Sequence, residues 1–443
     1  MKPSPRLIKI IVALFMLSAL AGFARFFASD LTQSLLSSVW QLCVLGLLIL
    51  VVIDRLLSGS RSAVSCVRDH PSSLALGAKS TLSLSLKNES PRSLSLVVSE
   101  IAAQELNITA FPARVELQRG QTQTLKYSVM PERRGDIAIE ATQVFVSSLL
   151  GLWQLQYRLP VVSHLKVFPN FMAVSHLALL LQGGSSKQLG IHLLQRRGQG
   201  TDFHQMRDYR ESDSLRQVDW CSTAKVGKLI SREFQDERDQ QVIFLLDCGR
   251  RMRAKDQALS HFDHALNALL LTAFIALRQG DAAGYHTFAG DAWGMKPAKG
   301  PHAINALINQ LYRIESSVAN SDYIAAAETI ASKRYKRSLV ILVSNVREED
   351  EDDLVVAVKL LSRHHLVLVA TLREAILDEV VERPIASLTD ALTYAGTIHH
   401  VNARSRIIKR LAAEGVIVSD CLPSELPMAL VNQYLALKSS GKF

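Results

Sequence analysis

The chain has 443 residues, of which 48% are hydrophobic, and its formal net charge is +9. This length predicts more than one domain. The basic residues form no dense run and do not alternate with aromatic side chains, so the charge does not indicate nucleic-acid binding. A basic surface close to an anionic membrane explains the sign of the charge as well. We therefore expect membrane lipid, and no nucleic acid, among the partners.

The cysteines indicate a reducing compartment. The five of them are scattered along the chain, and no C-x-x-C pair occurs. This pattern is not typical of a zinc site or of a disulfide framework.

Residues 1–57 are expected to lie in a membrane as two transmembrane helices, at about 7–28 and 31–53. The uncharged runs 10–24 and 31–53 are each close to the ~20 apolar residues that a spanning helix needs. Lys and Arg residues precede the first run and follow the second, so the positive-inside rule places both ends, and the bulk of the chain, in the cytoplasm. The alternative is a cleaved signal peptide ending near Ala21, which would leave the second run as an anchor and could invert the topology.

Residues 58–169 are expected to form a β-sandwich of the immunoglobulin-like kind. Polar and apolar residues alternate in the segments 81–88, 93–99 and 124–129, with turn residues between them. About seven short strands at this spacing are typical of such a sandwich. The module contains no charged cluster that would suggest chemistry.

Residues 170–240 contain a linker and a charged segment, Arg196–Trp220, around which the chain is organised. The segment mixes five Arg residues with acidic and aromatic side chains. One interpretation is a network in which arginines pair with carboxylates while the aromatics anchor the segment to a core. The other is an ordinary charged surface loop.

Residues 241–443 alternate buried strands with amphipathic helices, which predicts a mainly parallel sheet covered on both faces. The expected strands are 241–247, 282–288, 338–344, 365–371 and 416–419. The expected helices are 262–280, 301–313, 322–334, 402–414 and 424–438.

The charged segment resembles the signature of the domain of unknown function 58 family. The matching residues are Gly198, Gly200, Asp202, Phe203, Arg207, Tyr209, Asp213, Arg216, Asp219 and Trp220, followed by Ala224, Gly227, Lys228, Leu229 and Arg232. The α/β region resembles a von Willebrand factor type A domain, and the family contains one. The predicted fold is therefore multi-domain: a transmembrane helical hairpin, a β-sandwich and an α/β domain of that type.

The resemblance implies a protein of the bacterial inner membrane that crosses it more than once. It also implies a partner, a MoxR-type AAA+ ATPase, and a role in the assembly or maturation of other protein complexes. A transglutaminase-like membrane protein is a second partner that the resemblance suggests. On this interpretation the chain is a binding adaptor and not an enzyme, and the signature segment braces the α/β domain or presents it to the ATPase.

Type A domains carry a magnesium-type site with the pattern D-x-S-x-S, and the resemblance places its remains at Asp247, Ser321 and Asn345. Gly249 and Arg251 stand where the two hydroxyl residues belong, and a cation there repels a divalent ion. We therefore expect a degenerate metal site, no cofactor, and Asp247 paired with Arg250 or Arg251 in a protein-contact surface. The alternative is a magnesium- or manganese-dependent ligand-binding receptor.

A hydrolase is the remaining alternative, with His204, Asp219 and Cys221 as its catalytic set. Nothing in their spacing requires them to meet, and the chain has no P-loop, HExxH or GxSxG motif. The acidic run 348–353 is expected to be a solvated loop that leads into a helix. The histidine pairs 364–365 and 399–400 are expected to be exposed or interfacial.

Overall fold

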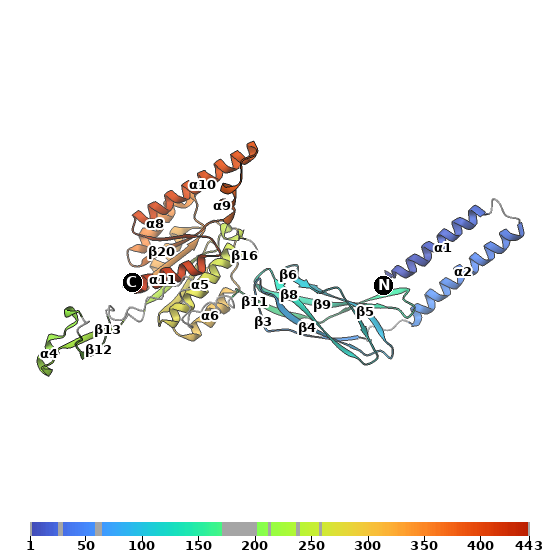
Figure 1. Cartoon of the computed structure of the whole chain (residues 1–443), viewed down its shortest axis with the longest axis horizontal. Coiled ribbons are helices and arrows are strands. Elements are labelled where there is room, and N and C mark those ends of the chain that lie inside the picture. The colour runs from blue at the N-terminus through green and yellow to red at the C-terminus, as the bar shows by residue number, and fades with distance from the viewer. Residues whose placement is uncertain are drawn as a thin grey trace. The chain divides into compact units, whose positions relative to one another are not determined.

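The computed structural model describes residues 2–24, 30–57, 64–170, 202–210, 214–235, 240–256 and 259–441. The chain divides into two compact units, Met1–Val167 and Phe168–Phe443. The colours from blue to teal mark the first unit, and those from green to red mark the second (Figure 1).

The first unit begins with two long helices, α1 (Pro5–Ala24) and α2 (Asp30–Leu57). Within the described residues, one stretch, Ser38–Leu56, is long and apolar enough to cross a membrane. Large apolar side chains such as Phe15 and Leu42 are exposed on the two helices. A water-facing helix pair would bury such side chains, so this surface suits contact with lipid.

The rest of the first unit is built from two antiparallel sheets. One sheet contains β2 (Val64–Asp69), β4 (Ser80–Asn88), β8 (Thr122–Pro131) and β6 (Leu106–Thr109). The other contains β1 (Lys2–Pro3), β10 (Trp153–Leu159), β9 (Gly135–Ser147), β11 (Ser163–Phe168), β3 (Ser73–Ala75), β5 (Leu94–Ala102) and β7 (Ala113–Leu117). More strands form than the seven or so expected from the alternating segments.

The alternating sequence explains the packing of these sheets. Leu82, Leu84 and Leu86 of β4 are buried, and the residues between them face outward, as the two-residue period of a strand requires. Arg68 on β2 reaches Glu100 on β5 in the other sheet. The two sheets therefore face each other across a shared core, which is the arrangement of a sandwich.

The second unit starts with a small β-α-β element from the signature segment. It contains β12 (Asp202–Asp208), the 3-10 turn η3 (Leu215–Gln217), α4 (Trp220–Val226) and β13 (Ile230–Gln235). The strands β12 and β13 pair in antiparallel fashion.

The larger part of the second unit is an α/β region. Its elements in chain order are β14 (Gln241–Asp247), η4 (Arg250–Arg253), β15 (Lys255–Asp256), β16 (Leu259–Ser260), α5 (His261–Arg278), β17 (Ala282–Phe288), β18 (Gly294–Ala298), α6 (Pro301–Leu311), α7 (Tyr323–Ser332), β19 (Leu339–Ser344), η5 (Glu348–Asp350), α8 (Glu351–Ser362), β20 (Leu366–Leu372), α9 (Ala375–Glu382), α10 (Leu388–Ala413), β21 (Ile417–Cys421) and α11 (Leu426–Ser439).

Six of these strands form one sheet in the order β18-β17-β14-β19-β20-β21. β17, β14, β19, β20 and β21 pair in parallel, and only the edge strand β18 is antiparallel. Phe244 of β14 packs into a core with α5, α6 and α11, whereas Ile243 packs into a core with α7, α8 and α10. Helices thus cover both faces of the sheet, as the figure shows (Figure 1).

Two expectations about this region are corrected by the structure. The acidic run is not simply a solvated loop, because it forms η5 and the first turn of α8, and Asp350 is buried. His365 is not exposed either, because it precedes the buried strand β20 and is itself buried. Burial lowers the pKa of His365, since desolvation disfavours the charged ring.

Candidate functional site at the carboxyl edge of the sheet

The candidate site lies where the parallel strands β14 and β19 end. Asp247 is the last residue of β14, and Ser344 is the last residue of β19. Neighbouring parallel strands bring their carboxyl ends to one edge, and open α/β sheets bind ligands at that edge. Ser321, from the loop before α7, reaches the same place.

The carboxylate of Asp247 is buried and held by neutral donors. Its Oδ2 accepts hydrogen bonds from the Ser344 hydroxyl at 2.5 Å and the Ser321 hydroxyl at 2.8 Å. Its Oδ1 accepts from the Gly249 amide at 2.7 Å and again from Ser321 at 2.9 Å. Burial raises the pKa of Asp247, and the bonds from Ser344, Gly249 and Ser321 oppose that rise. Both oxygens are therefore occupied without a partner of opposite charge.

Gly249 is required for this arrangement. A Cβ atom at this position would lie 2.7 Å from the Ser321 hydroxyl oxygen and 3.0 Å from Asp247 Oδ1. A side chain here would therefore displace the serine that bonds the carboxylate.

The expected pairing of Asp247 with Arg250 or Arg251 is wrong. Arg251 instead forms an ion pair with Asp350 through Nη1, and its Nη2 donates to Glu349 at 2.7 Å. The reason is access, because three closer donors already surround the Asp247 carboxylate. The positive charge of Arg251 still acts on Asp247 through space.

A small cavity of about 160 Å³ lies next to this cluster. It is lined by Arg250, Arg251, Asn320, Ser321, Glu349 and Asp350. Ser321 both lines the cavity and bonds Asp247, so its side chain connects the buried carboxylate to the cavity lining. We call these six lining residues together with Asp247 the Asp247 cluster.

Asn345, the third residue of the expected metal site, is turned toward different partners. Its Nδ2 donates to Glu374 at 3.0 Å, and Glu374 also accepts from Arg347 at 3.0 Å. The structure thus brings Asp247 and Ser321 together and directs the Asn345 amide nitrogen to Glu374.

These residues do not fit a divalent cation. Among the three expected metal-site residues Asp247 is the one carboxylate, both of its oxygens accept hydrogen bonds, and the Arg251 cation acts on it. Magnesium prefers an octahedron of oxygen ligands and needs negative charge to replace its water shell. A guanidinium group near the Asp247 carboxylate opposes that requirement.

Further along the same edge, Arg404 of α10 holds the ends of two strands together. It is buried, pairs with Asp420 at 2.6 Å, and donates to the Thr371 hydroxyl at 2.7 Å. Sequence reasoning missed this residue because a basic residue within an amphipathic helix usually faces solvent.

Part of the expected signature network lies outside the described residues. Gly198, Gly200 and Asp213 are among these, and the side chains of Asp202, Phe203 and Arg216 are likewise outside the description. Arg207 lies on β12 and donates to the carbonyl of Asp208 at 3.2 Å. The backbone amide of Tyr209 donates to the carbonyl of Leu229 at 2.9 Å, which extends the β12–β13 pairing.

Asp219 is the residue of the signature segment whose role is most clearly structural. It is the N-cap of α4, because its Oδ1 accepts from the Ser222 amide at 2.9 Å, and its Oδ2 pairs with Arg232 at 2.6 Å. The Ser222 bond, followed by the Arg232 bond, lowers the pKa of Asp219 below its ordinary value. Both carboxylate oxygens serve the fold, which argues against Asp219 as the acid of a His204–Cys221 hydrolase site.

Trp220 differs from the expectation that the aromatics anchor the segment to a core. Its side chain is 65% exposed at the first position of α4. Asp219 caps α4 and so fixes where the helix starts. The Trp220 indole is therefore not needed to hold the start of the helix and can be exposed.

Taken together, the chain is a multi-domain protein that joins an apolar N-terminal helix, a two-sheet module and an α/β region whose polar site is at the carboxyl edge of its sheet. Residues 205–422 match the family model described as protein of unknown function DUF58, and this match supports placing the chain in that family. No match to a curated protein was found.

Three solved structures illustrate how partial the structural similarity is. A fragment of α2-macroglobulin from Escherichia coli is 26% identical, with 25% of this chain and 17% of that chain covered, at a TM-score of 0.21. A PapD-like domain of human CEP192 is 16% identical, with 25% and 89% covered, at a TM-score of 0.19. A mussel byssus matrix protein is 12% identical, with 46% of each chain covered, at a TM-score of 0.28. This chain thus spans less than a fifth of the α2-macroglobulin fragment, and scores this low carry no argument about function.

Proposed function

We propose that the chain is a membrane-anchored adaptor that binds a MoxR-type AAA+ ATPase and serves the assembly or maturation of other protein complexes. In this proposal the chain crosses the bacterial inner membrane twice, and the sandwich and the α/β region lie in the cytoplasm. The α/β region would act as a domain of the von Willebrand factor type A kind, and a transglutaminase-like membrane protein is a further candidate partner.

The Asp247 cluster carries the proposal. Its cavity presents side chains of both charges at the carboxyl edge of a sheet, the edge at which such sheets bind ligands. The buried carboxylate beneath it is satisfied by hydroxyl and amide donors, so it neither needs a metal ion nor has a free oxygen to act as a base. Such a surface favours recognition of another protein over catalysis.

The test is affinity purification of the full chain in mild detergent with ATP present, followed by mass spectrometry. Arg250 is exposed and lines the cavity, so Arg250→Glu should reduce recovery of the ATPase. Lys296→Glu makes the same charge change on the exposed edge strand β18 and should leave recovery unchanged. Recovery of no ATPase by the folded wild-type chain, or equal loss in both variants, would contradict the proposal.

The second candidate function is a receptor that binds its ligand through a divalent cation. The observation in its favour is that Ser321 and Asp247 do meet, at 2.8 Å. A rise in melting temperature with magnesium or manganese that disappears in Asp247→Ala would support this candidate. From the hydrogen bonds of Asp247 we expect no such rise.

A further inference from the structure

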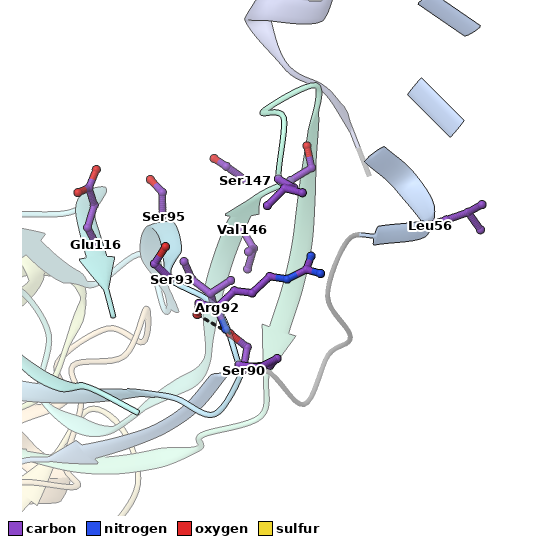
Figure 2. A pocket seen from close by; sticks show the side chains of 12 residues that line it. Leu56, Ser90, Arg92, Ser93, Ser95, Glu116, Val146 and Ser147 are labelled. Atoms are coloured by element: carbon purple, nitrogen blue, oxygen red, sulfur yellow. Dashed lines mark hydrogen bonds between the residues drawn. The ribbon is translucent and has the colours of Figure 1, made fainter. Parts of the chain in front are cut away.

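A pocket of about 550 Å³ lies in the first unit where α2 meets the sandwich. Leu56, the penultimate residue of α2, lines it together with Leu149 in the turn between β9 and β10. Farther along the sandwich, Arg92, Glu116, Ser93 and Ser95 line the pocket, with Val146 among them (Figure 2). The charged side chains of the pocket thus lie away from the leucines at the end of the candidate membrane span.

The polar wall of the pocket is built rigidly. Asn88 is fully buried, and its Nδ2 donates to the carbonyls of Arg92 at 2.7 Å and Leu117 at 3.1 Å. Its Oδ1 accepts from both the amide and the hydroxyl of Ser90. The loop that presents Arg92 is therefore held in place before any ligand arrives, which lowers the entropic cost of binding.

The apolar wall is equally fixed. Asp54 of α2 is buried and accepts hydrogen bonds from the Ser148 hydroxyl at 2.5 Å and the Leu150 amide at 2.8 Å. The Trp153 indole also donates to the carbonyl of Val51 at 3.2 Å. The end of the candidate membrane span and the β9–β10 turn thus form one continuous surface, on which Leu149 and Leu150 are exposed.

The charges in the pocket are balanced and separated. Arg92 supplies one cation and Glu116 one anion, and Ser95 lies directly opposite Glu116 in the β5–β7 pairing. In the view of Figure 2, Arg92 lies between Leu56 and Glu116, with Ser93 and Ser95 beside it. A ligand entering from the apolar end would meet the guanidinium group before the carboxylate.

We propose that this pocket binds the headgroup of a zwitterionic phospholipid that carries a primary ammonium group, such as phosphatidylethanolamine. The phosphate accepts hydrogen bonds from Arg92 and from the hydroxyls of Ser93 and Ser95, because guanidinium groups pair well with phosphate oxygens. The ammonium group donates to Glu116, and the start of the acyl chains contacts Leu56 and Leu149. The inference rests on the membrane anchoring of the proposed function but not on the ATPase.

The experiment is native mass spectrometry of the full chain in mild detergent, titrated separately with phosphatidylethanolamine, phosphatidylcholine and phosphatidylglycerol. We expect one ethanolamine lipid to bind about tenfold more tightly than the choline lipid, whose quaternary ammonium has no hydrogen to donate to Glu116. The glycerol lipid lacks a cation and should also bind less tightly. Equal binding of all three lipids would overturn the proposal.

Two variants test the contacts with the phosphate and with the ammonium group separately. Arg92→Ala should weaken binding of both the ethanolamine and the choline lipid, whereas Glu116→Gln should remove only the preference between them. The controls Arg119→Ala and Glu132→Gln change exposed residues outside the pocket lining and should leave lipid binding as in the wild type. Circular dichroism would confirm that each variant is folded. If Arg92→Ala binds lipid like Arg119→Ala, the pocket assignment is wrong.

A competition experiment distinguishes binding of a lipid from binding of a free phosphate compound. Glycerophosphoethanolamine has the same headgroup without acyl chains, so it should compete only at far higher concentration than the lipid. Competition at equal concentration would overturn the lipid assignment.

Cell fractionation tests the membrane anchoring independently of the lipid. A chain found outside the membrane contradicts the proposed function, whereas a membrane-embedded chain without lipid selectivity contradicts only this inference.

Discussion

The two units contain buried carboxylates that are stabilised in opposite ways. Glu100 in the sandwich is paired with Arg68, and the side chains of both are 0% exposed. Asp247 in the α/β region is held by hydroxyl and amide groups alone. Burial raises the pKa of both carboxyls. At Glu100 a cation in direct contact opposes the rise, because Arg68 donates two hydrogen bonds to it, whereas at Asp247 the charge of Arg251 opposes the rise only through space.

The difference separates a structural site from one suited to binding. The Arg68–Glu100 pair also engages Thr142 and Tyr127, so its hydrogen bonds connect strands of both sheets. Asp247 lies at a sheet edge, beneath a cavity lined by charged side chains. A partner can change the electrostatic environment of Asp247 but cannot reach Glu100.

The largest effect is expected from breaking the structural pair. Arg68→Met should lower the free energy of unfolding by about 3–5 kcal/mol, because it leaves Glu100 buried without its cation. Arg158→Met removes one partner of an exposed pair with Glu140 and should cost about 0–1 kcal/mol. Chemical denaturation in mild detergent measures both values. Equal costs would show that the buried pair is not the structural centre of the sandwich.

A smaller effect is expected at Asp247. Asp247→Ala should cost about 1–3 kcal/mol, since it leaves the Gly249 amide and the Ser344 hydroxyl without their acceptor. Asp247→Asn keeps the shape and should fold better than the alanine variant. If recovery of the ATPase nevertheless falls in the asparagine variant, the charge of Asp247 contributes to binding. Unchanged recovery would restrict its role to folding.

Acidification should also distinguish the units. Burial lowers the pKa of His261, His264, His286 and His365 in the α/β region, to about 4 for His286. The unfolded chain therefore binds more protons than the folded one between the ordinary histidine value of 6.5 and about 4, so stability falls as the pH falls through that window. The protection of the β14 and β19 amides relative to their intrinsic exchange rates, compared at pH 7 and pH 5, measures the effect. Undiminished protection at pH 5 would contradict it.

The smallest effect is expected at Trp220. Because its side chain is largely exposed, Trp220→Ala should change the free energy of unfolding by no more than about 0.5 kcal/mol. Asp219→Ala, in contrast, removes the cap of α4 and should speed hydrogen exchange in that helix. Equal effects in the two variants would show that the indole has a packing role of its own.

The strands of the α/β region could be predicted from the sequence because they are buried on both faces. The segment 241–247 was expected as a strand and forms β14 with the same limits. The first half of α10 was missed because the helix is largely exposed there and shows little apolar periodicity. Ser387 and Asp390 form a capping box at its start, so the spacing S-x-x-D was a readable signal.

Only part of the candidate site could be predicted from the sequence. The meeting of Asp247 and Ser321 follows from placing both at the carboxyl edge of a parallel sheet. Ser344 was missed because the last residue of a buried strand has no sequence feature that marks it as a ligand for a neighbour. The pairing of Arg251 with Asp350 joins residues 99 positions apart, and charge alone cannot select that partner among many acidic residues.

The attachment of the helices to the sandwich has a mechanical consequence. Before α1, Lys2 and Pro3 pair with β10, and the Ser4 hydroxyl donates to the carbonyl of Gly151. After most of α2, Asp54 is bonded to the same β9–β10 hairpin. One attachment point would let the helices pivot in any direction, whereas two points restrict the motion to rotation about the line that joins them. A force applied to the sandwich therefore acts on both helices of the pair.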